Sequence, residues 1–341
     1  MSYVTKKILS KKHSNTIEIE IHLFEDCNLS CAFCCQDHSM KGLTGITINE
    51  KYELVESYIA KKTDSWDSFS VNLMGGELFQ DQYSDDWFDE YESLVLKINS
   101  LLIGKRVQFN FTSNLIFEKR ERVLKFLNRL KELEIKVSLQ TSFDFAGRSW
   151  NEEQKKTFKS NLDYFLNSIT SVSVTLHKLS IHSMLKKRDH LFEYCYENFP
   201  INFDWYVPDL KNSNIFHPSD KDCKQALLHL AKYYPRSHPI KDYLENETND
   251  IQCCSENRIL IAADNSISNC QYLDYNPKNF LGLPNKNTVS EMAERFLTSQ
   301  GCLSCENLDR CGLYCFVAAD FASRQRDTVD CFLKEFYSEV D

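Results

Sequence analysis

The chain has 341 residues, of which 42% are hydrophobic and 26% charged, and its formal net charge is −9. This composition supports a large folded core and excludes a disordered chain, while the excess of 49 acidic over 40 basic residues argues against a nucleic-acid partner. No run approaches the roughly 18 apolar residues of a membrane span and no signal peptide is visible, so we expect a cytoplasmic protein with no membrane partner.

Strand-like and helix-like segments alternate along the first 210 residues. Apolar or alternating runs predict strands, and segments with apolar residues at three- and four-residue steps predict helices. The predicted strands are Ile17–Leu23, Ser68–Met74, Arg106–Thr112, Lys136–Ser142, Ser171–Leu176 and Ile201–Val207. The predicted helices are Asn49–Lys62, Asp85–Leu101, Glu118–Leu133, Asn151–Ile169 and Ile181–Asn198. The alternation predicts βαβ units and a parallel sheet, either open and doubly wound or a partly closed barrel.

The alternation stops near Pro208, and the cysteine content then rises: eight of the 14 cysteines follow residue 250. Without an export signal, we interpret these cysteines as ligands for metal or redox chemistry and not as disulfides. The predicted divisions are an N-terminal extension (1–16), an α/β domain (17–210), a bridging helical segment (211–250), a cysteine-rich domain (251–335) and a tail (336–341).

A first cysteine cluster follows the first predicted strand directly. It contains Cys27, Cys31 and Cys34, with Cys35 as a spare. Ligand sites gather at the carboxyl ends of parallel strands, so the position suits a site. Three thiolates from one short loop can hold three corners of a 4Fe–4S cluster and leave the fourth iron open. A zinc loop or buried free thiols are the alternatives.

The spacing Cys27-x3-Cys31-x2-Cys34, with the aromatic Phe33 before the last cysteine, resembles the signature loop of the radical SAM enzymes. The resemblance implies a 4Fe–4S cluster on these cysteines, S-adenosylmethionine (SAM) on its open iron, Phe33 in the cofactor site, and Cys35 as a non-ligand. Reductive cleavage of SAM would give a 5′-deoxyadenosyl radical that abstracts a substrate hydrogen. The electron would come from a donor such as flavodoxin or ferredoxin.

The second and third predicted strands also end in segments that resemble this family. Gly75-Gly76-Glu77 resembles the element that receives the methionine ammonium of SAM, and its glycines permit close backbone approach. Asn114 stands where many relatives have glycine. We expect Asn114 to adopt the left-handed conformation there, since Asn tolerates it better than most residues.

The fourth predicted strand ends in a segment that resembles the family's Ser-x-Asp-Gly turn, with Phe145 in place of the glycine. The resemblance implies that Ser142 reaches the SAM ribose and that Arg148 faces the SAM carboxylate. His177, at the end of the fifth strand, either lines a substrate cavity or is a structural histidine.

The cysteines after residue 250 form a second pattern, of which Cys302-x2-Cys305-x5-Cys311-x3-Cys315 is the most specific part. A zinc ribbon is the alternative reading. Together with the upstream cysteines, the pattern resembles the SPASM extension of radical SAM enzymes, which binds two auxiliary 4Fe–4S clusters. Asn265 occupies its glycine position, where a left-handed residue is expected.

The SPASM resemblance implies one set of ligands for each auxiliary cluster. The distal cluster would use Cys302, Cys305, Cys311 and Cys331. The proximal cluster would use Cys254, Cys270 and Cys315, with Cys253, Cys223 or an open iron as its fourth position. We expect Cys195, on a predicted helix, to be a buried apolar residue.

These resemblances imply a partial (β/α)6 TIM-like barrel of the radical SAM type with a small cysteine-rich SPASM domain, three 4Fe–4S clusters and SAM. The implied activity is oxidation or crosslinking of side chains in a peptide or protein substrate. The alternative is a dehydrogenase or epimerase of a small molecule such as a sugar or antibiotic precursor. Only 16 residues precede the first strand, so a peptide-modifying enzyme would need a separate leader-binding protein or leader-independent binding. Gln271 replaces the Asp base of sulfatase maturases, which argues against sulfatase maturation.

Overall fold

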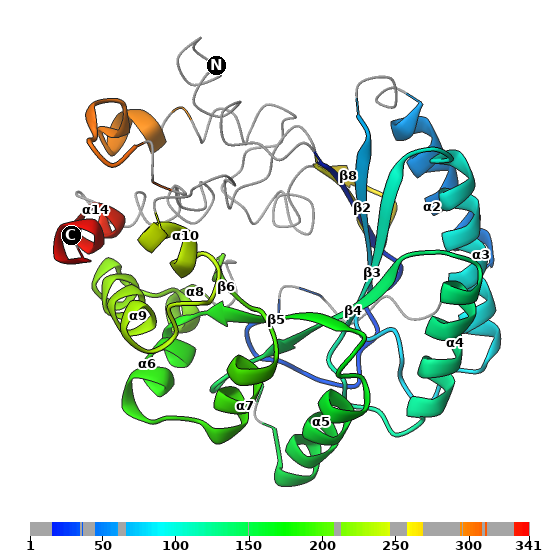
Figure 1. Ribbon diagram of the computed structural model, residues 1–341, viewed down its shortest axis with the longest axis horizontal. Helices are drawn as coiled ribbons and strands as arrows, with labels where there is room; N and C mark the ends of the chain where they lie inside the picture. The colour runs from blue at the N-terminus through cyan, green and yellow to red at the C-terminus, as the bar shows by residue number, and fades with distance from the viewer. Residues whose placement is uncertain are drawn as a thin grey trace.

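The computed structural model describes residues 16–34, 36, 45–60, 66–148, 150–207, 213–245, 258–268, 294, 296–308, 311 and 331–340. These ranges contain an eight-stranded sheet in the order β6-β5-β4-β3-β2-β1-β7-β8 (Figure 1). Every neighbouring pair is parallel except β7 and β8. The strands are β1 (Thr16–His22), β2 (Ser68–Met74), β3 (Arg106–Ser113), β4 (Val137–Phe143), β5 (Ile169–Leu176), β6 (Ile201–Trp205), β7 (Arg258–Ile261) and β8 (Ile267–Ser268).

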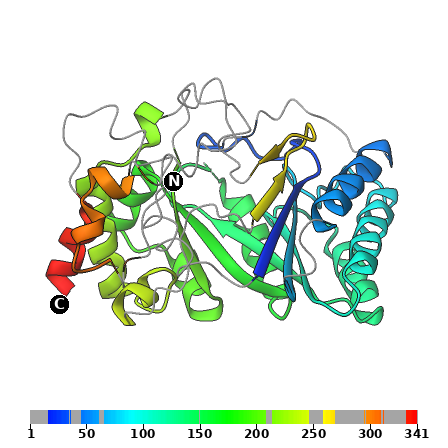
Figure 2. The ribbon, with the colours of Figure 1, turned by 90° about the horizontal axis from the view of Figure 1, so that it is seen from above.

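Helices follow the strands along the chain and cover the outer face of the curved sheet (Figures 1 and 2). They are α2 (Gly45–Ile59), α3 (Asp86–Leu101), α4 (Arg120–Glu132), α5 (Glu152–Tyr164), α6 (Lys178–Lys186) and α7 (His190–Asn198). The segment predicted as one fifth helix is therefore two helices. The second begins because the Asp189 side chain accepts hydrogen bonds from Leu191 N and Phe192 N, which caps α7. No described helix is both long and apolar enough to cross a bilayer.

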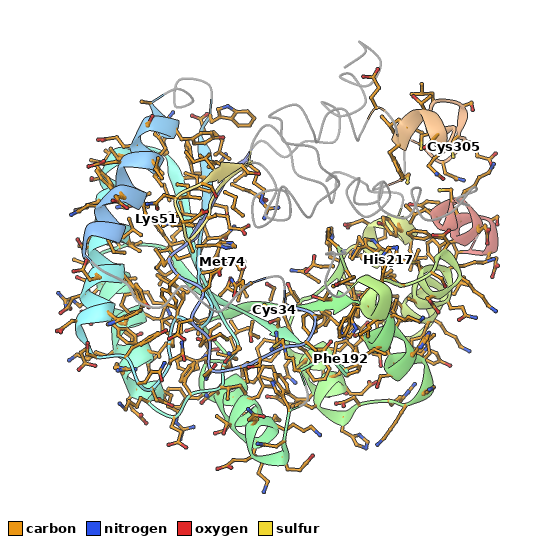
Figure 3. The ribbon with its side chains drawn as sticks, turned by 180° about the vertical axis from the view of Figure 1, so that it is seen from behind. Cys34, Lys51, Met74, Phe192, His217 and Cys305 are labelled. Carbon is orange, nitrogen blue, oxygen red and sulfur yellow. The ribbon has the colours of Figure 1, made fainter. Side chains whose placement is uncertain are left out.

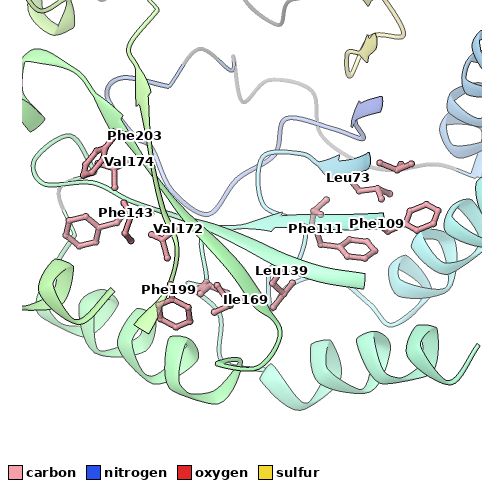
Figure 4. Close-up of a cluster of buried hydrophobic side chains, with 14 of the residues drawn as sticks. Leu73, Phe109, Phe111, Leu139, Phe143, Ile169, Val172, Val174, Phe199 and Phe203 are labelled. Atoms are coloured by element: carbon pink, nitrogen blue, oxygen red, sulfur yellow. The ribbon is translucent and has the colours of Figure 1, made fainter. Parts of the chain in front are cut away.

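The core lies between the sheet and these helices. Alternate residues of β1, namely Ile17, Ile19 and Ile21, are fully buried on the helix-facing side. Leu73, Phe111 and their neighbours continue this apolar layer across the sheet (Figure 4). Because side chains alternate across a strand, the residues between them face the concave side. The apolar face of each strand therefore forms the core with the helices.

The six predicted strands and their parallel arrangement are confirmed, and the structure adds β7 and β8 to the same sheet. Strand β7, which lies within the 251–335 range of the predicted cysteine-rich domain, pairs with the free edge of β1. Arg258 on β7 also forms an ion pair with the buried carboxylate of Glu20 on β1. Burial opposes ionisation of Glu20, but the charge of Arg258 and the hydrogen bond to His22 outweigh it and hold the pKa of Glu20 at about 2.

The β7–β8 hairpin also contacts helix α2. Lys51 is fully buried, and its ammonium group donates a hydrogen bond to the backbone carbonyl of Ala262. The preceding residue on the helix, Glu50, accepts a hydrogen bond from Asn265 Nδ2 at 2.6 Å. Asn265 has φ of 66°, so the left-handed conformation expected at this position is confirmed.

Lys51 should make stability depend on pH in the alkaline range. Burial lowers the pKa of Lys51 to about 8 from its usual 10.5, so the unfolded chain binds this proton more tightly than the folded chain. The free energy of unfolding should therefore rise with pH between about 8 and 10.5, by up to roughly 3 kcal/mol from this group. Urea unfolding of the wild type and Lys51→Met on both sides of this window measures the effect. A difference between the two proteins that does not change with pH would contradict it.

After β6 the chain forms α8 (Ser213–Phe216), α9 (Asp220–Tyr233) and α10 (Ile240–Glu245), and the last described element is α14 (Phe332–Val340). The residues expected as a C-terminal tail thus continue a helix. Helix α14 packs on α9, where Lys224 Nζ lies 2.9 Å from Glu335 and 2.6 Å from Glu339. Phe332 contacts the ring of Trp205 on β6 with centroids 5.1 Å apart. These contacts attach the C-terminal helix to the β6 end of the sheet.

Candidate functional site

The loop after β1 carries three half-buried thiols, those of Cys27, Cys31 and Cys34. Cys34 lies near the centre of the curved sheet, at the inner side of the open barrel (Figure 3). Burial and the nearby charges of Glu77, Cys31 and Cys34 raise the pKa of Cys27 to about 12. Burial and the nearby charge of Cys31 raise the pKa of Cys34 to about 11. Burial is the largest cause of these shifts, and the charges of the neighbouring thiols add to it, so ionised thiolates here would be favoured by a nearby positive charge. Cys35 lies outside the described residues.

Arg148 supplies positive charge beside two of these thiols. Its guanidinium favours ionisation of both Cys31 and Cys34, although burial keeps their pKa values raised. Arg148 Nη1 donates to the carbonyl of Ser142 at 2.9 Å, and Nη2 donates to the Ser142 hydroxyl. Ser142 and Arg148, both expected in the SAM site, are thus joined at the end of β4. The Nε of Arg148 is buried and has no hydrogen-bond partner among the described residues, as expected for a site that receives a further acceptor.

Glu77 organises the ends of β2 and β3. Its fully buried carboxylate accepts hydrogen bonds from Ser113 Oγ at 2.8 Å, Asn114 N at 2.5 Å and Phe79 N at 3.0 Å. Burial raises the pKa of Glu77 despite these three donors. The expected contact of Glu77 with the SAM ammonium stays a prediction, and the structure shows that this carboxylate already holds two strand ends together.

Asn114 connects the end of β3 to the cysteine loop. Its Nδ2 donates to Asn28 Oδ1 at 2.8 Å and lies 3.8 Å from the sulfur of Cys27. The expected left-handed conformation of Asn114 is wrong, because the residue with positive φ is Leu115, at 57°. The Asn114 side chain accepts from Ile116 N at 2.8 Å, and this local hydrogen bond forms the turn instead.

Gly75 and Gly76 bring the β2 end against the cysteine loop. A Cβ atom at Gly76 would overlap the carbonyl group of Asp26 and lie 2.6 Å from the oxygen of Glu25. The amide of Glu77 donates to the same Asp26 carbonyl at 3.0 Å. Gly75 O accepts a hydrogen bond from Gln36 Nε2 at 2.9 Å, so Gln36, just after the cysteines, also binds the glycine pair.

Phe33 lies beside the fifth strand. Its ring stacks on His177 with centroids 4.8 Å apart and is half-buried. His177 is completely buried, as expected of a structural histidine. The contact between Phe33 and SAM stays a prediction.

Four thiols gather in the C-terminal part of the chain, those of Cys302, Cys305, Cys311 and Cys331 (Cys305 is labelled in Figure 3). Burial, and to a smaller extent the charges of Cys331, Cys311 and Cys305, raise the pKa of Cys302 to about 12. Cys331 directly precedes α14, and backbone amides of its first turn donate to the thiol, which opposes the effect of burial on its pKa. These are the four cysteines expected at the distal cluster.

The other expected cysteines fall in two groups. Cys253, Cys254, Cys270 and Cys315 lie outside the described residues. Cys195 is buried in α7, as expected, and Cys223 is buried in α9. Within the described ranges no three His, Cys, Asp or Glu side chains are grouped so as to hold a single metal ion. An iron–sulfur cluster binds each thiolate at a separate iron, so it needs a wider spacing than one ion does.

Two contacts of the site were not expected from the sequence. Asn28, inside the cysteine loop, donates to the carbonyl of Ile116 at 2.6 Å. Asp144 accepts a hydrogen bond from His177 and from the turn that carries Arg148. The presence of an Asn and an Asp after strand ends could have indicated that their side chains hydrogen-bond to the backbone. The residue type alone does not show which group each side chain contacts.

No family model and no curated protein matches the chain. Among solved structures, the chain is similar to coproporphyrinogen III oxidase (HemN) from Escherichia coli, a radical SAM enzyme, at 10% identity and a TM-score of 0.41. The match covers 76% of this chain and 65% of that one, so the chain spans less than two thirds of HemN.

Proposed function

We propose that the chain is a radical SAM enzyme in which Cys27, Cys31 and Cys34 hold a 4Fe–4S cluster. One observation carries the proposal: three thiols of one loop lie with the guanidinium of Arg148 at the carboxyl ends of a parallel, barrel-like sheet. The donor set fits an anionic cluster, because Arg148 favours ionisation of Cys31 and Cys34 and its Nε lacks a partner among the described residues. When bound, the cluster and SAM supply a radical that abstracts a hydrogen atom from substrate.

The protein's own part is to hold the thiols and exclude alternative partners. Glu77 joins the ends of β2 and β3 beneath the loop, and Asn114 connects β3 to Asn28 within it. The closely fitted Gly76 leaves no space between β2 and Asp26. Rigid positioning of this kind is how a site directs a reactive group toward one bond.

We further propose two auxiliary clusters in a SPASM-type domain, the distal one on Cys302, Cys305, Cys311 and Cys331. The effect of the other three charges on the pKa of Cys302 supports it. A cluster there would accept the electron left on a substrate radical. With auxiliary clusters, oxidation or crosslinking of a peptide or protein is the activity that we propose first, with flavodoxin or ferredoxin as reductant.

A second candidate is a polar small molecule as substrate. Concave-face residues on neighbouring strands, Asn72, Asn110 and Ser138, form a hydrogen-bonded row: Asn110 Nδ2 donates to Asn72 Oδ1, and Ser138 Oγ donates to Asn110 Oδ1, each at 2.7 Å. Barrel interiors usually hold branched apolar side chains, so this polar face favours a substrate rich in hydrogen-bonding groups.

Metal analysis of the anaerobically purified chain tests the proposal. We expect a brown protein with about twelve irons and matching sulfide for three clusters. A colourless protein that carries zinc would contradict the proposal and support a zinc-binding protein. Two assays separate the substrate classes. Mass spectrometry would detect modification of a co-expressed peptide that is encoded beside the gene, and incubation of the enzyme with polar small molecules would detect their conversion.

A further inference from the structure

His177 is buried and held at both ring nitrogens. Nδ1 accepts a hydrogen bond from Ser180 N at 3.1 Å, which caps helix α6. A nitrogen that accepts carries no proton, so this pattern assigns the proton to Nε2. Nε2 lies 2.7 Å from Asp144 Oδ1 and therefore donates to it. The end of β5 thus fixes the orientation of a carboxylate at the end of β4.

The second carboxylate oxygen of Asp144 shapes the turn that carries Arg148. Oδ2 accepts from the backbone amides of Ala146 at 2.9 Å, Gly147, and Arg148 at 3.1 Å. Three amide donors on one oxygen fix the turn conformation. Burial opposes ionisation of Asp144, but the hydrogen bond from His177 and the charge of Arg148 lower its pKa below the usual value.

The same pair contacts the cysteine loop through Phe33. The Phe33 ring stacks on His177 at an interplanar angle of 29°, and Ala32 N donates to Gly147 O at 3.2 Å. A Cβ atom at Gly147 would lie 2.9 Å from both Phe33 Cε1 and His177 Nε2, so the loop, the turn and the imidazole fit without spare room. Phe33 is next to Cys34, which places this packing directly beside a proposed cluster ligand.

We propose that Asp144 and His177 are positioning residues that set, through Phe33 and the 146–148 turn, where Cys31, Cys34 and Arg148 lie. The inference rests on the proposed radical SAM function. Both residues are buried, and they would act through the groups that they hold. Since misplacement by about 1 Å can cost roughly 100-fold in rate, a dyad that fixes both the loop and the guanidinium controls the efficiency of SAM cleavage.

Two near-isosteric variants test this, with one control. His177→Phe keeps an aromatic ring against Phe33 but removes both the donor to Asp144 and the acceptor for Ser180 N. Asp144→Asn keeps the volume, but the three amides require its oxygen, so its NH₂ group faces the Nε2 proton of His177 and the two donors repel. His182→Gln, on the same helix, breaks a partly exposed pair with Asp222 at 2.9 Å and serves as the control.

Two measurements on the full-length chain decide the matter. In the metal-free chain, alkylation of Cys31 and Cys34, mapped by peptide mass spectrometry, should be about tenfold faster in both variants than in the wild type and the control. In the reconstituted chain, kcat for SAM cleavage should fall roughly 100-fold with little change in KM. The electron paramagnetic resonance spectrum of the reduced cluster should also respond differently to SAM.

The outcomes distinguish this inference from the proposed function. A wild-type chain that binds no cluster contradicts the proposed function, and the alkylation rates then still test the positioning of the loop. The inference is overturned if the wild type cleaves SAM and both variants have the same alkylation rate, kcat and spectrum as the wild type. If His177→Phe fails to fold, Asp144→Asn alone decides, because it leaves the packed volume unchanged.

Discussion

Replacing Gly76 by alanine should displace the cysteine loop and remove its cluster. The new Cβ atom would overlap the Asp26 carbonyl, and the backbone there has no flexible side chain that could move aside. Overpacking of this kind costs about 3 kcal/mol, and here the loop that must move carries Cys27. We expect a lower thermal unfolding temperature and the loss of about four irons per chain.

Gly75→Ala is the matched control for this substitution. Its Cβ atom would lie 3.1 Å from Cε2 of the Phe24 ring and 3.2 Å from the Phe24 carbonyl, distances that small shifts can relieve. The variant should lose less stability than Gly76→Ala and retain its iron. Equal iron content in Gly76→Ala and the wild type would show that the contact between Gly76 and Asp26 does not hold the loop.

Single cysteine substitutions should show which cysteines bind which cluster, because each should remove the iron of one cluster only. Cys27→Ala, Cys31→Ala or Cys34→Ala should abolish SAM cleavage, because three thiolates leave one iron open for SAM and two do not hold the cluster. Cys302→Ala should lose about four irons but keep the SAM-dependent change in the spectrum of the remaining clusters. Iron analysis and electron paramagnetic resonance of each variant measure these outcomes.

Two further substitutions serve as controls for the cysteine sets. Cys195→Ala, in the core on α7, should keep full iron content and SAM cleavage. Cys35→Ala should keep SAM cleavage as well, since Cys35 does not fit the ligand spacing. Loss of cleavage on changing Cys35 alone would show that the assigned ligands are wrong. Loss of all iron in Cys302→Ala would show that the two cysteine regions do not bind independently.

The strands could be predicted from the sequence because the alternation of apolar and polar residues within each strand shows which of its faces is buried. The period-two pattern of Ile17, Ile19 and Ile21 identifies a strand with one apolar face, whatever its neighbours are. The β7–β8 hairpin could not be placed in the sheet in this way. Its pairing with β1 depends on the ion pair of Arg258 with Glu20 and the contact of Lys51 with Ala262, which join residues more than 200 positions apart.

The candidate site was predictable only as a set of residue types. Spacing indicated Cys27, Cys31 and Cys34, but the identity of Glu77 does not reveal that its carboxylate is occupied by three donors. Similarly, Asn114 suits a left-handed turn by residue type, yet its side chain makes the turn with φ positive at Leu115 instead. The tendency of a residue type toward one backbone conformation is not followed where its side chain can form a hydrogen bond in another conformation.

The central claim is that the thiols of the β1 loop form a SAM-cleaving centre. Its most direct test is the formation of 5′-deoxyadenosine and methionine from SAM by the anaerobically reconstituted, dithionite-reduced chain, with Cys34→Ala in parallel. We predict both products from the wild type and neither from the variant. A fully reconstituted wild type that leaves SAM intact, or a Cys34→Ala chain that cleaves it equally well, would contradict the claim.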